Sequence, residues 1–110
     1  MRAARIVDGK PVISEKVFQA QVKKAALLTG WMYYATWNSI HSPAGFPDCV
    51  LVHPKKKRII FCELKSEKGK LSEKQREWIN ALCQIAHPPE LDVCVIRPAD
   101  FDDFYSLLSR

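Results

Sequence analysis

The sequence predicts an α/β fold in which one mixed β-sheet is covered by helices on both faces. Three observations support this fold class. Segments with helical spacing of apolar residues alternate with short β-prone runs in the order α-β-β-β-α-β-α. Residues 59–62 are apolar at every position, which is typical of a central strand covered on both sides. The length of 110 residues suits one domain, which we place at residues 14–110, after an N-terminal arm at residues 1–13.

A first helix is expected at residues 14–29. Ser14 suits the N-cap, and Glu15 places an acid in the first turn, where the helix dipole favours negative charge. Gly30 is a typical stop signal. The apolar residues that share one face at helical spacing are Phe18, Val22, Ala25 and Ala26.

Three strands are expected after this helix. Residues 31–37 are aromatic and β-prone, and residues 38–47 form a loop rich in serine and proline. Residues 48–53 and 58–64 then form a hairpin around a turn at residues 54–57. The three lysines of that turn are expected to be solvated, at the end of the strands away from any catalytic group.

The C-terminal half predicts a helix, a strand and a short final helix. Ser72 and Gln75 fit a capping box, and the proline-containing residues 87–89 end the helix that it begins. The expected apolar face of this helix is Trp78, Leu82, Ile85 and Ala86. Residues 91–96 form the last strand, and a helix follows from Pro98. Its apolar face is Phe101, Phe104 and Leu108.

Composition excludes several classes of protein. Hydrophobic residues at 47% and charged residues at 26% are globular proportions, not those of a disordered chain. No apolar run approaches the ~20 residues of a membrane-spanning helix, and no signal peptide is evident, so we expect a cytoplasmic location. A net charge of +5 allows a polyanionic partner without requiring one. The four cysteines lack metal-ligand spacing and are expected to be buried free thiols: Cys49, Cys62, Cys83 and Cys94.

Three charged residues stand at strand ends where a core-building sequence would not place them. Asp48 begins one strand of the hairpin, and Glu63 and Lys65 close the other. Since side chains alternate along a strand, Glu63 and Lys65 point to one face and Leu64 to the other. If the strands pair, Asp48 and Glu63 converge, and a divalent cation such as Mg²⁺ would relieve their repulsion. Lys65 could then orient an attacking water or stabilise charge on a phosphodiester.

Each of these residues also has an ordinary interpretation when it is taken alone. Glu63 and Lys65 could form a surface ion pair worth less than ~1 kcal/mol. Asp48 could be a turn residue after Pro47. The combination of all three with a preceding loop and a following basic segment favours the catalytic interpretation.

These residues resemble the PD-(D/E)XK nucleases, and in particular the VRR-NUC subfamily. The matching segments are residues 42–48, residues 63–72 with Gln75, and residues 96–100, where Ile96 stands in place of the family's frequent tryptophan. The resemblance implies a restriction-endonuclease-like fold that binds Mg²⁺ or Mn²⁺. The implied metal ligands are Asp48, Glu63 and the Leu64 carbonyl, with Lys65 as the catalytic lysine.

The resemblance also implies roles for residues outside the strand ends. The family's helix-one acid maps to Glu15, a catalytic and metal-binding position, although an exposed first-turn acid is an alternative. Gln75 matches a glutamine that the family has near the site, and the alternative is that it belongs to the capping box. We expect that one side chain could serve both roles only in turn. The expected DNA contacts are Ser39, His41, Ser42, Lys68, Lys70, Gln75 and Gln19. For the lysines, a solvated loop is the alternative.

The implied function is a metal-dependent, structure-selective endonuclease that hydrolyses phosphodiester bonds in branched DNA such as Holliday junctions. Two symmetric cuts in a four-way junction imply a homodimer. Its interface is expected either on the strand at residues 31–37 or on the final helix, at Phe101, Phe104, Leu107 and Leu108. The alternatives are a flap or nicking nuclease that acts with a partner, and a catalytically silent DNA-binding module on the same fold.

Overall fold

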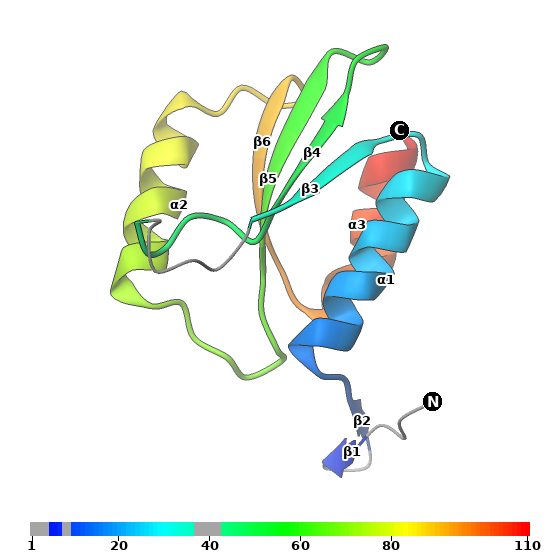
Figure 1. Ribbon diagram of the computed structural model, residues 1–110, viewed down its shortest axis with the longest axis vertical. Helices are drawn as coiled ribbons and strands as arrows, with labels where there is room; N and C mark the ends of the chain where they lie inside the picture. The colour runs from blue at the N-terminus through cyan, green and yellow to red at the C-terminus, as the bar shows by residue number, and fades with distance from the viewer. Residues whose placement is uncertain (1–4, 8–9, 37–42) are drawn as a thin grey trace.

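A computed structural model describes residues 5–7, 10–36 and 43–110 (Figure 1). Its elements in chain order are β1 (Arg5–Val7), β2 (Lys10–Val12), α1 (Glu15–Leu28), β3 (Met32–Ala35), β4 (Cys49–His53), β5 (Arg58–Leu64), α2 (Glu73–Ile85), β6 (Leu91–Ile96), a 3₁₀ turn η1 (Pro98–Asp100) and α3 (Phe101–Ser109). From α1 onward this is the predicted order. Before α1, where an arm was expected, β1 and β2 pair antiparallel, with Ile6 opposite Pro11.

The main sheet has the strand order β3-β4-β5-β6. Its first three strands are antiparallel neighbours, and α2 crosses over between β5 and β6, which run parallel. Helices α1 and α3 cover one face of the sheet, and α2 covers the other (Figure 1). This arrangement confirms the predicted mixed α/β, restriction-endonuclease-like fold. No helix in the described ranges has the length and apolar character needed to cross a membrane.

Helix α1 forms as its sequence predicts. The Ser14 hydroxyl accepts a hydrogen bond from the Val17 N–H at 3.2 Å, and Gly30, at a φ of 89°, reverses the chain after the last turn. The four residues of the predicted apolar face, Phe18, Val22, Ala25 and Ala26, are all buried in the core.

Helix α2 buries a different set of residues from the one expected. Ile79 and Leu82 are buried against the sheet, whereas Ile85 is 65% exposed in the last turn of the helix. The expectation for Ile85 was therefore wrong. Cys83 is exposed, because it follows the buried Leu82 and points about 100° around the helix. All four cysteines are free thiols, as expected. The expectation that they are buried is confirmed only for Cys49 and Cys62, since Cys94 is half-buried.

Helix α3 uses its apolar face to close the core. Phe104 is 4% exposed and Leu108 is fully buried, and Phe101 and Leu107 pack against the same cluster. The expectation that this face offers exposed apolar surface for a dimer was wrong, because the sheet needs a second helix beside α1 to cover it. On the other side of the sheet, the edge strand β3 does expose Met32 and Tyr34.

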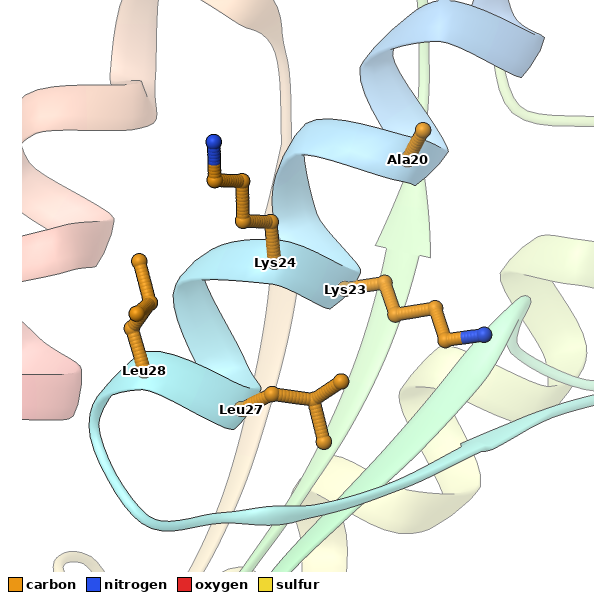
Figure 2. A pocket seen from close by; sticks show the side chains of 5 residues that line it. All are labelled: Ala20, Lys23, Lys24, Leu27 and Leu28. Atoms are coloured by element: carbon orange, nitrogen blue, oxygen red, sulfur yellow. The ribbon is translucent and has the colours of Figure 1, made fainter.

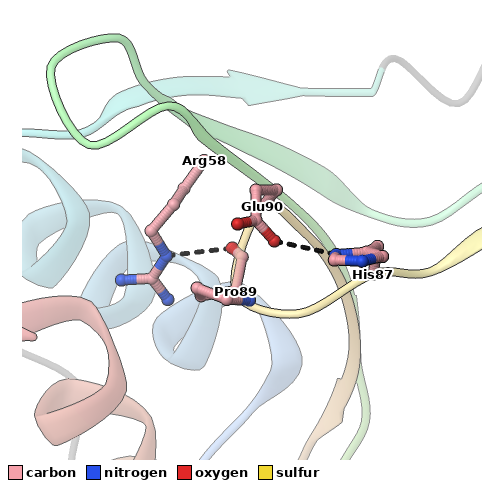
Figure 3. Close-up of polar contacts among 4 residues, drawn as sticks. All are labelled: Arg58, His87, Pro89 and Glu90. Carbon is pink, nitrogen blue, oxygen red and sulfur yellow. Dashed lines mark hydrogen bonds and ion pairs between the residues drawn. The ribbon is translucent and has the colours of Figure 1, made fainter.

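The turn between β4 and β5 lies at the end of the sheet opposite Asp48 and Glu63. There, the Trp31 indole N–H donates to the Leu108 carbonyl at 3.0 Å, and the Arg58 guanidinium stacks over the Trp31 ring. Arg58 Nε also donates to the Pro89 carbonyl at 3.1 Å, next to the contact between His87 and Glu90 (Figure 3). These contacts fix the end of α3 and the segment that leads into β6.

Replacement of Phe18 with alanine tests the core that α1 builds. Phe18→Ala should lower the free energy of unfolding by about 3–5 kcal/mol, because the ring fills the space between α1 and the sheet. Urea denaturation measures this change. The matched control is Val17→Ala, since Val17 precedes Phe18 on the same helix but is 45% exposed; a similar loss in both variants would contradict the packing described here.

Candidate functional site

Strand pairing brings Asp48 and Glu63 to one end of the sheet. Cys49 pairs with Cys62 across β4 and β5, so Asp48 and Glu63 are the next residues in the register. The Asp48 Oδ2 atom accepts a hydrogen bond from the Leu64 N–H at 2.7 Å. The backbone of Leu64 therefore lies against the Asp48 carboxyl group, in the arrangement expected from the hairpin.

Glu63 is the acid that the fold buries most deeply among the described residues. Its exposure is 1%, and its Oε2 atom is buried with no hydrogen-bond partner in the described part of the chain. Burial raises the pKa of Glu63 to about 9, with further contributions from a hydrogen bond with Asp48 and from the charge of Asp48. Lys65 opposes this rise in the pKa, because its positive charge favours the carboxylate.

The donor set fits a hard divalent cation. The charge of Asp48 raises the pKa of the adjacent Glu63 carboxyl group, whose Oε2 atom is buried and unpartnered, and a cation between the two groups would offset this effect. Carboxylate oxygens are the ligands that Mg²⁺ and Mn²⁺ prefer. The unpartnered Oε2 atom of Glu63 is the observation that a bound cation would explain.

Gln75 joins α2 to this site, and here the expectation of alternating roles was wrong. Its Oε1 atom accepts from the Ser72 N–H at 2.9 Å, which completes the capping box at the start of α2. Its Nε2 group donates to Glu63 Oε1 at 3.4 Å at the same time. An amide side chain has an acceptor and a donor at separate atoms, so one glutamine serves both roles together.

The residues before Asp48 hold it in place through contacts with α2 and β3. Gly45 has a φ of 98°, and a Cβ atom there would lie 2.5 Å from the backbone carbonyl of Lys74. The Phe46 ring packs edge-on against Trp78 at 5.1 Å between centroids. The Thr36 hydroxyl donates to the Pro47 carbonyl at 2.9 Å. Each residue of the segment 45–47 thus has a contact that fixes its position.

Lys65 directly follows β5 and forms the central group of the site together with Asp48, Glu63 and Leu64. Its N–H donates to the Ile96 carbonyl at 3.0 Å, which continues the pairing of β5 with β6 by one residue. Its half-buried side chain is close enough to Glu63 to lower the pKa of that acid. Asp48, Glu63, Leu64 and Lys65 are therefore brought together.

Two residues predicted on α1 are not part of this group. Glu15 is exposed, and its charge is the last of the causes that raise the pKa of Glu63. No cluster of three acids, histidines or cysteines suited to a metal is found within the described ranges. Gln19 lies beside Tyr33: burial raises the pKa of the Tyr33 hydroxyl to about 12, and Gln19 opposes that rise.

The candidate DNA contacts divide into two groups. Lys68 and Lys70 are exposed in the segment that follows Lys65, on the side of the sheet end where the acids meet. The loop residues Ser39, His41 and Ser42 lie outside the part of the chain that the structure describes.

Sequence reasoning gave no role to Arg97 beyond its place in a motif. In the structure its guanidinium binds the backbone of the segment after Lys65. About 30 residues separate the two segments, so no local spacing could have indicated this contact. The parallel pairing of β5 and β6 brings them together.

A shallow pocket on the outer face of α1 offers no groups for chemistry. It is lined by Ala20, Lys23, Lys24, Leu27 and Leu28 (Figure 2). Its lining contains neither an acid nor a histidine, so we place the functional site at the sheet end that holds Asp48 and Glu63.

Comparison with known proteins gives two matches. The family model described as "VRR-NUC domain" matches residues 7–97. A "Fanconi-associated nuclease 1 homolog" from Schizosaccharomyces pombe is 41% identical over 54 residues, which cover 49% of this chain and 7% of that protein. The matched region is thus a small part of the relative's length. No solved structure matches the chain.

The raised pKa of Glu63 predicts a pH-dependent stability in the absence of divalent metal. Between pH 5 and 9 the folded state keeps a proton that Glu63 releases on unfolding, so the free energy of unfolding should fall by up to about 1.4 kcal/mol per pH unit. Glu63→Gln should remove this slope, because the amide cannot ionise. Urea denaturation in EDTA at several pH values measures it. An exposed-acid control, Glu73→Gln, should keep the wild-type slope; an equal slope in Glu63→Gln would contradict the assignment.

The positive φ of Gly45 predicts that alanine is not tolerated there. Gly45→Ala should lower the free energy of unfolding by more than about 1 kcal/mol, because both the φ of 98° and the overlap with the Lys74 carbonyl oppose a Cβ atom. Thermal unfolding provides the measurement. Gly69→Ala is the matched control, since the one close approach of its Cβ would be to the Ser66 hydroxyl at 2.8 Å, which can rotate, and the next atoms lie at 3.6 Å. Equal melting temperatures for both variants would show that Gly45 is not packed as described.

Proposed function

The chain belongs to the VRR-NUC domain family and is a nuclease domain, and on this premise we propose that it is a Mg²⁺-dependent endonuclease that cuts branched DNA such as four-way junctions. The observation that supports a metal-dependent reaction is the buried, unpartnered oxygen of Glu63 beside Asp48. A DNA-binding module that lacks catalytic activity would have no use for two converging acids beside phosphate.

Asp48, Glu63 and the Leu64 carbonyl would hold Mg²⁺ or Mn²⁺. When bound, the ion polarises the phosphodiester and offsets the negative charge that develops during attack by water. Gln75 orients the Glu63 carboxylate through its Nε2 contact at 3.4 Å. Asp48 is oriented by the Leu64 N–H, so both acids are pre-positioned by groups on neighbouring elements.

Lys65 supplies the positive charge on the protein side of the reaction. Its ammonium group lies on the same strand face as Glu63, two residues further on. There it stabilises negative charge on the attacked phosphate and orients the water that attacks. Glu15, at the start of α1, is close enough to influence Glu63, and we assign it the outermost position of the site.

DNA is recognised by its shape in this proposal. The chain of 12.6 kDa has a net charge of +5 and no reader module such as a helix-turn-helix among its described elements. Lys68 and Lys70 contact phosphates, which position DNA without reading its sequence. The further contacts proposed are Gln19, Gln75, Ser39, His41 and Ser42.

A four-way junction requires two symmetric cuts, and a homodimer supplies the two sites. The apolar face of α3 is not available for an interface, because it is buried in the core. The edge strand β3 is the remaining candidate, since it has no neighbour on its outer side in the described sheet and exposes Met32 and Tyr34.

Cleavage assays with labelled four-way junction, flap and linear duplex test this function. Wild-type protein should nick the junction symmetrically with Mg²⁺ or Mn²⁺ and be inactive in EDTA. Asp48→Asn and Lys65→Met should each lower the cleavage rate by about 10²–10⁴-fold, because the first removes a charge that would hold the metal ion and the second a charge that acts on the phosphate. The control Lys55→Ala alters the turn at the opposite end of the sheet and should keep the wild-type rate.

The other outcomes separate the competing functions. Cleavage of flaps but not junctions would replace junction selectivity with a flap or nicking function. Binding of DNA without cleavage in any metal would support the DNA-binding module instead. Full activity of Asp48→Asn would contradict the proposed site.

A further inference from the structure

We propose that Arg97 and Glu67 form a latch that holds the lysine-bearing segment 65–70 in the conformation that binds DNA phosphate. Arg97 is in this view a positioning residue, which acts on DNA through the backbone of another segment. The inference rests on the proposed function, since it concerns how the same site binds DNA.

The Arg97 guanidinium donates hydrogen bonds to backbone carbonyls of the turn at residues 66–69. Its Nη1 group donates to the Ser66 carbonyl and to the Gly69 carbonyl, both at 2.6 Å, so both hydrogens of that nitrogen are used. A longer contact of 3.4 Å reaches the Glu67 carbonyl. The side chain therefore faces backbone oxygens, and its charge offsets the negative ends of these carbonyl dipoles.

In a second contact, the side chain belongs to the turn and the backbone group to the segment after β6. Glu67, within the turn, accepts a hydrogen bond at 2.6 Å from the Ala99 N–H, at the start of the chain segment after β6. The Lys65 N–H donates to the Ile96 carbonyl next to it. Residues 65–69 and 96–99 are thus joined by reciprocal hydrogen bonds, from each segment to the other.

These contacts hold the backbone that carries the basic side chains. Residues 66–69 form a turn closed by the Gly69 N–H and the Ser66 carbonyl at 3.3 Å, with exposed Lys68 at its tip and Lys70 just beyond. The segment lies in neither a strand nor a helix. An ordered turn presents its lysines at fixed positions, so less side-chain and backbone entropy is lost when phosphate binds.

Two pairs of variants separate this positioning role from simple charge. Glu67→Ala and Glu67→Gln both remove one negative charge, which by charge alone should strengthen DNA binding equally. Only glutamine keeps an oxygen that can accept from the Ala99 N–H. Arg97→Lys keeps the positive charge but has a shorter side chain and lacks the planar NH₂ group whose two hydrogens reach the Ser66 and Gly69 carbonyls.

The experiment measures affinity for a four-way junction by fluorescence anisotropy in EDTA, across a range of salt concentrations. We expect Glu67→Ala and Arg97→Lys to bind several-fold more weakly than Glu67→Gln, with a salt slope smaller by about 1–2, because one or two phosphate contacts are lost. A purely structural role would lower the melting temperature without changing the salt slope. Equal affinities and slopes for Glu67→Ala and Glu67→Gln would overturn the proposal.

Limited trypsin digestion tests the latch without DNA. Mass spectrometry should show faster cleavage after Lys68 or Lys70 in Glu67→Ala and Arg97→Lys than in wild type and Glu67→Gln, because the turn is released. Unchanged cleavage rates would overturn the latch itself. If wild-type protein binds no DNA while the digestion pattern is as expected, the proposed function fails and the phosphate-binding role fails with it, whereas the latch as a structural feature stands.

Discussion

The site depends on one constraint, the burial of the Glu63 carboxyl group directly beside Asp48. A sheet that only had to form a core would place an apolar residue at this position of β5. Burial and the neighbouring acid raise the pKa of Glu63 to about 9, so at neutral pH the group holds a proton unless a cation replaces it. The fold thus holds two carboxyl groups in an unfavourable arrangement, and a divalent ion between them would reduce their repulsion.

The elements around Asp48 and Glu63 are arranged to restrict the movement of these two acids. Gly45 allows the loop before Asp48 to approach the backbone of α2, and Gln75 at the start of α2 contacts Glu63. On the other side, the parallel pairing of β5 with β6 brings Arg97 against the segment after Lys65. Helix capping, a tight loop and strand pairing therefore each contribute contacts around the site. A site built in this way needs little rearrangement to bind its ligands.

Much of the fold could be predicted from local sequence signals. The Ser14 cap, the Ser72 capping box and the apolar spacing of α1 predicted the helices, and the continuous apolar run at residues 59–62 predicted the central strand β5. Asp48 and Glu63 could be placed together because a hairpin fixes its own register. The errors concern facts that depend on distant neighbours: which side of α2 meets the sheet, whether α3 closes the core, and how the two ends of the Gln75 amide are used. The contact of Arg97 was not predictable for the same reason.

Proton release on metal binding tests the central claim most directly. Isothermal titration of the protein with Mn²⁺ at pH 7, in buffers of different ionisation enthalpy, gives the number of protons released per ion bound. The account predicts close to one proton for wild type, because Glu63 must ionise to become a ligand, and little binding for Glu63→Gln. Tight binding of Mn²⁺ without proton release, or unchanged binding by Glu63→Gln, would contradict it.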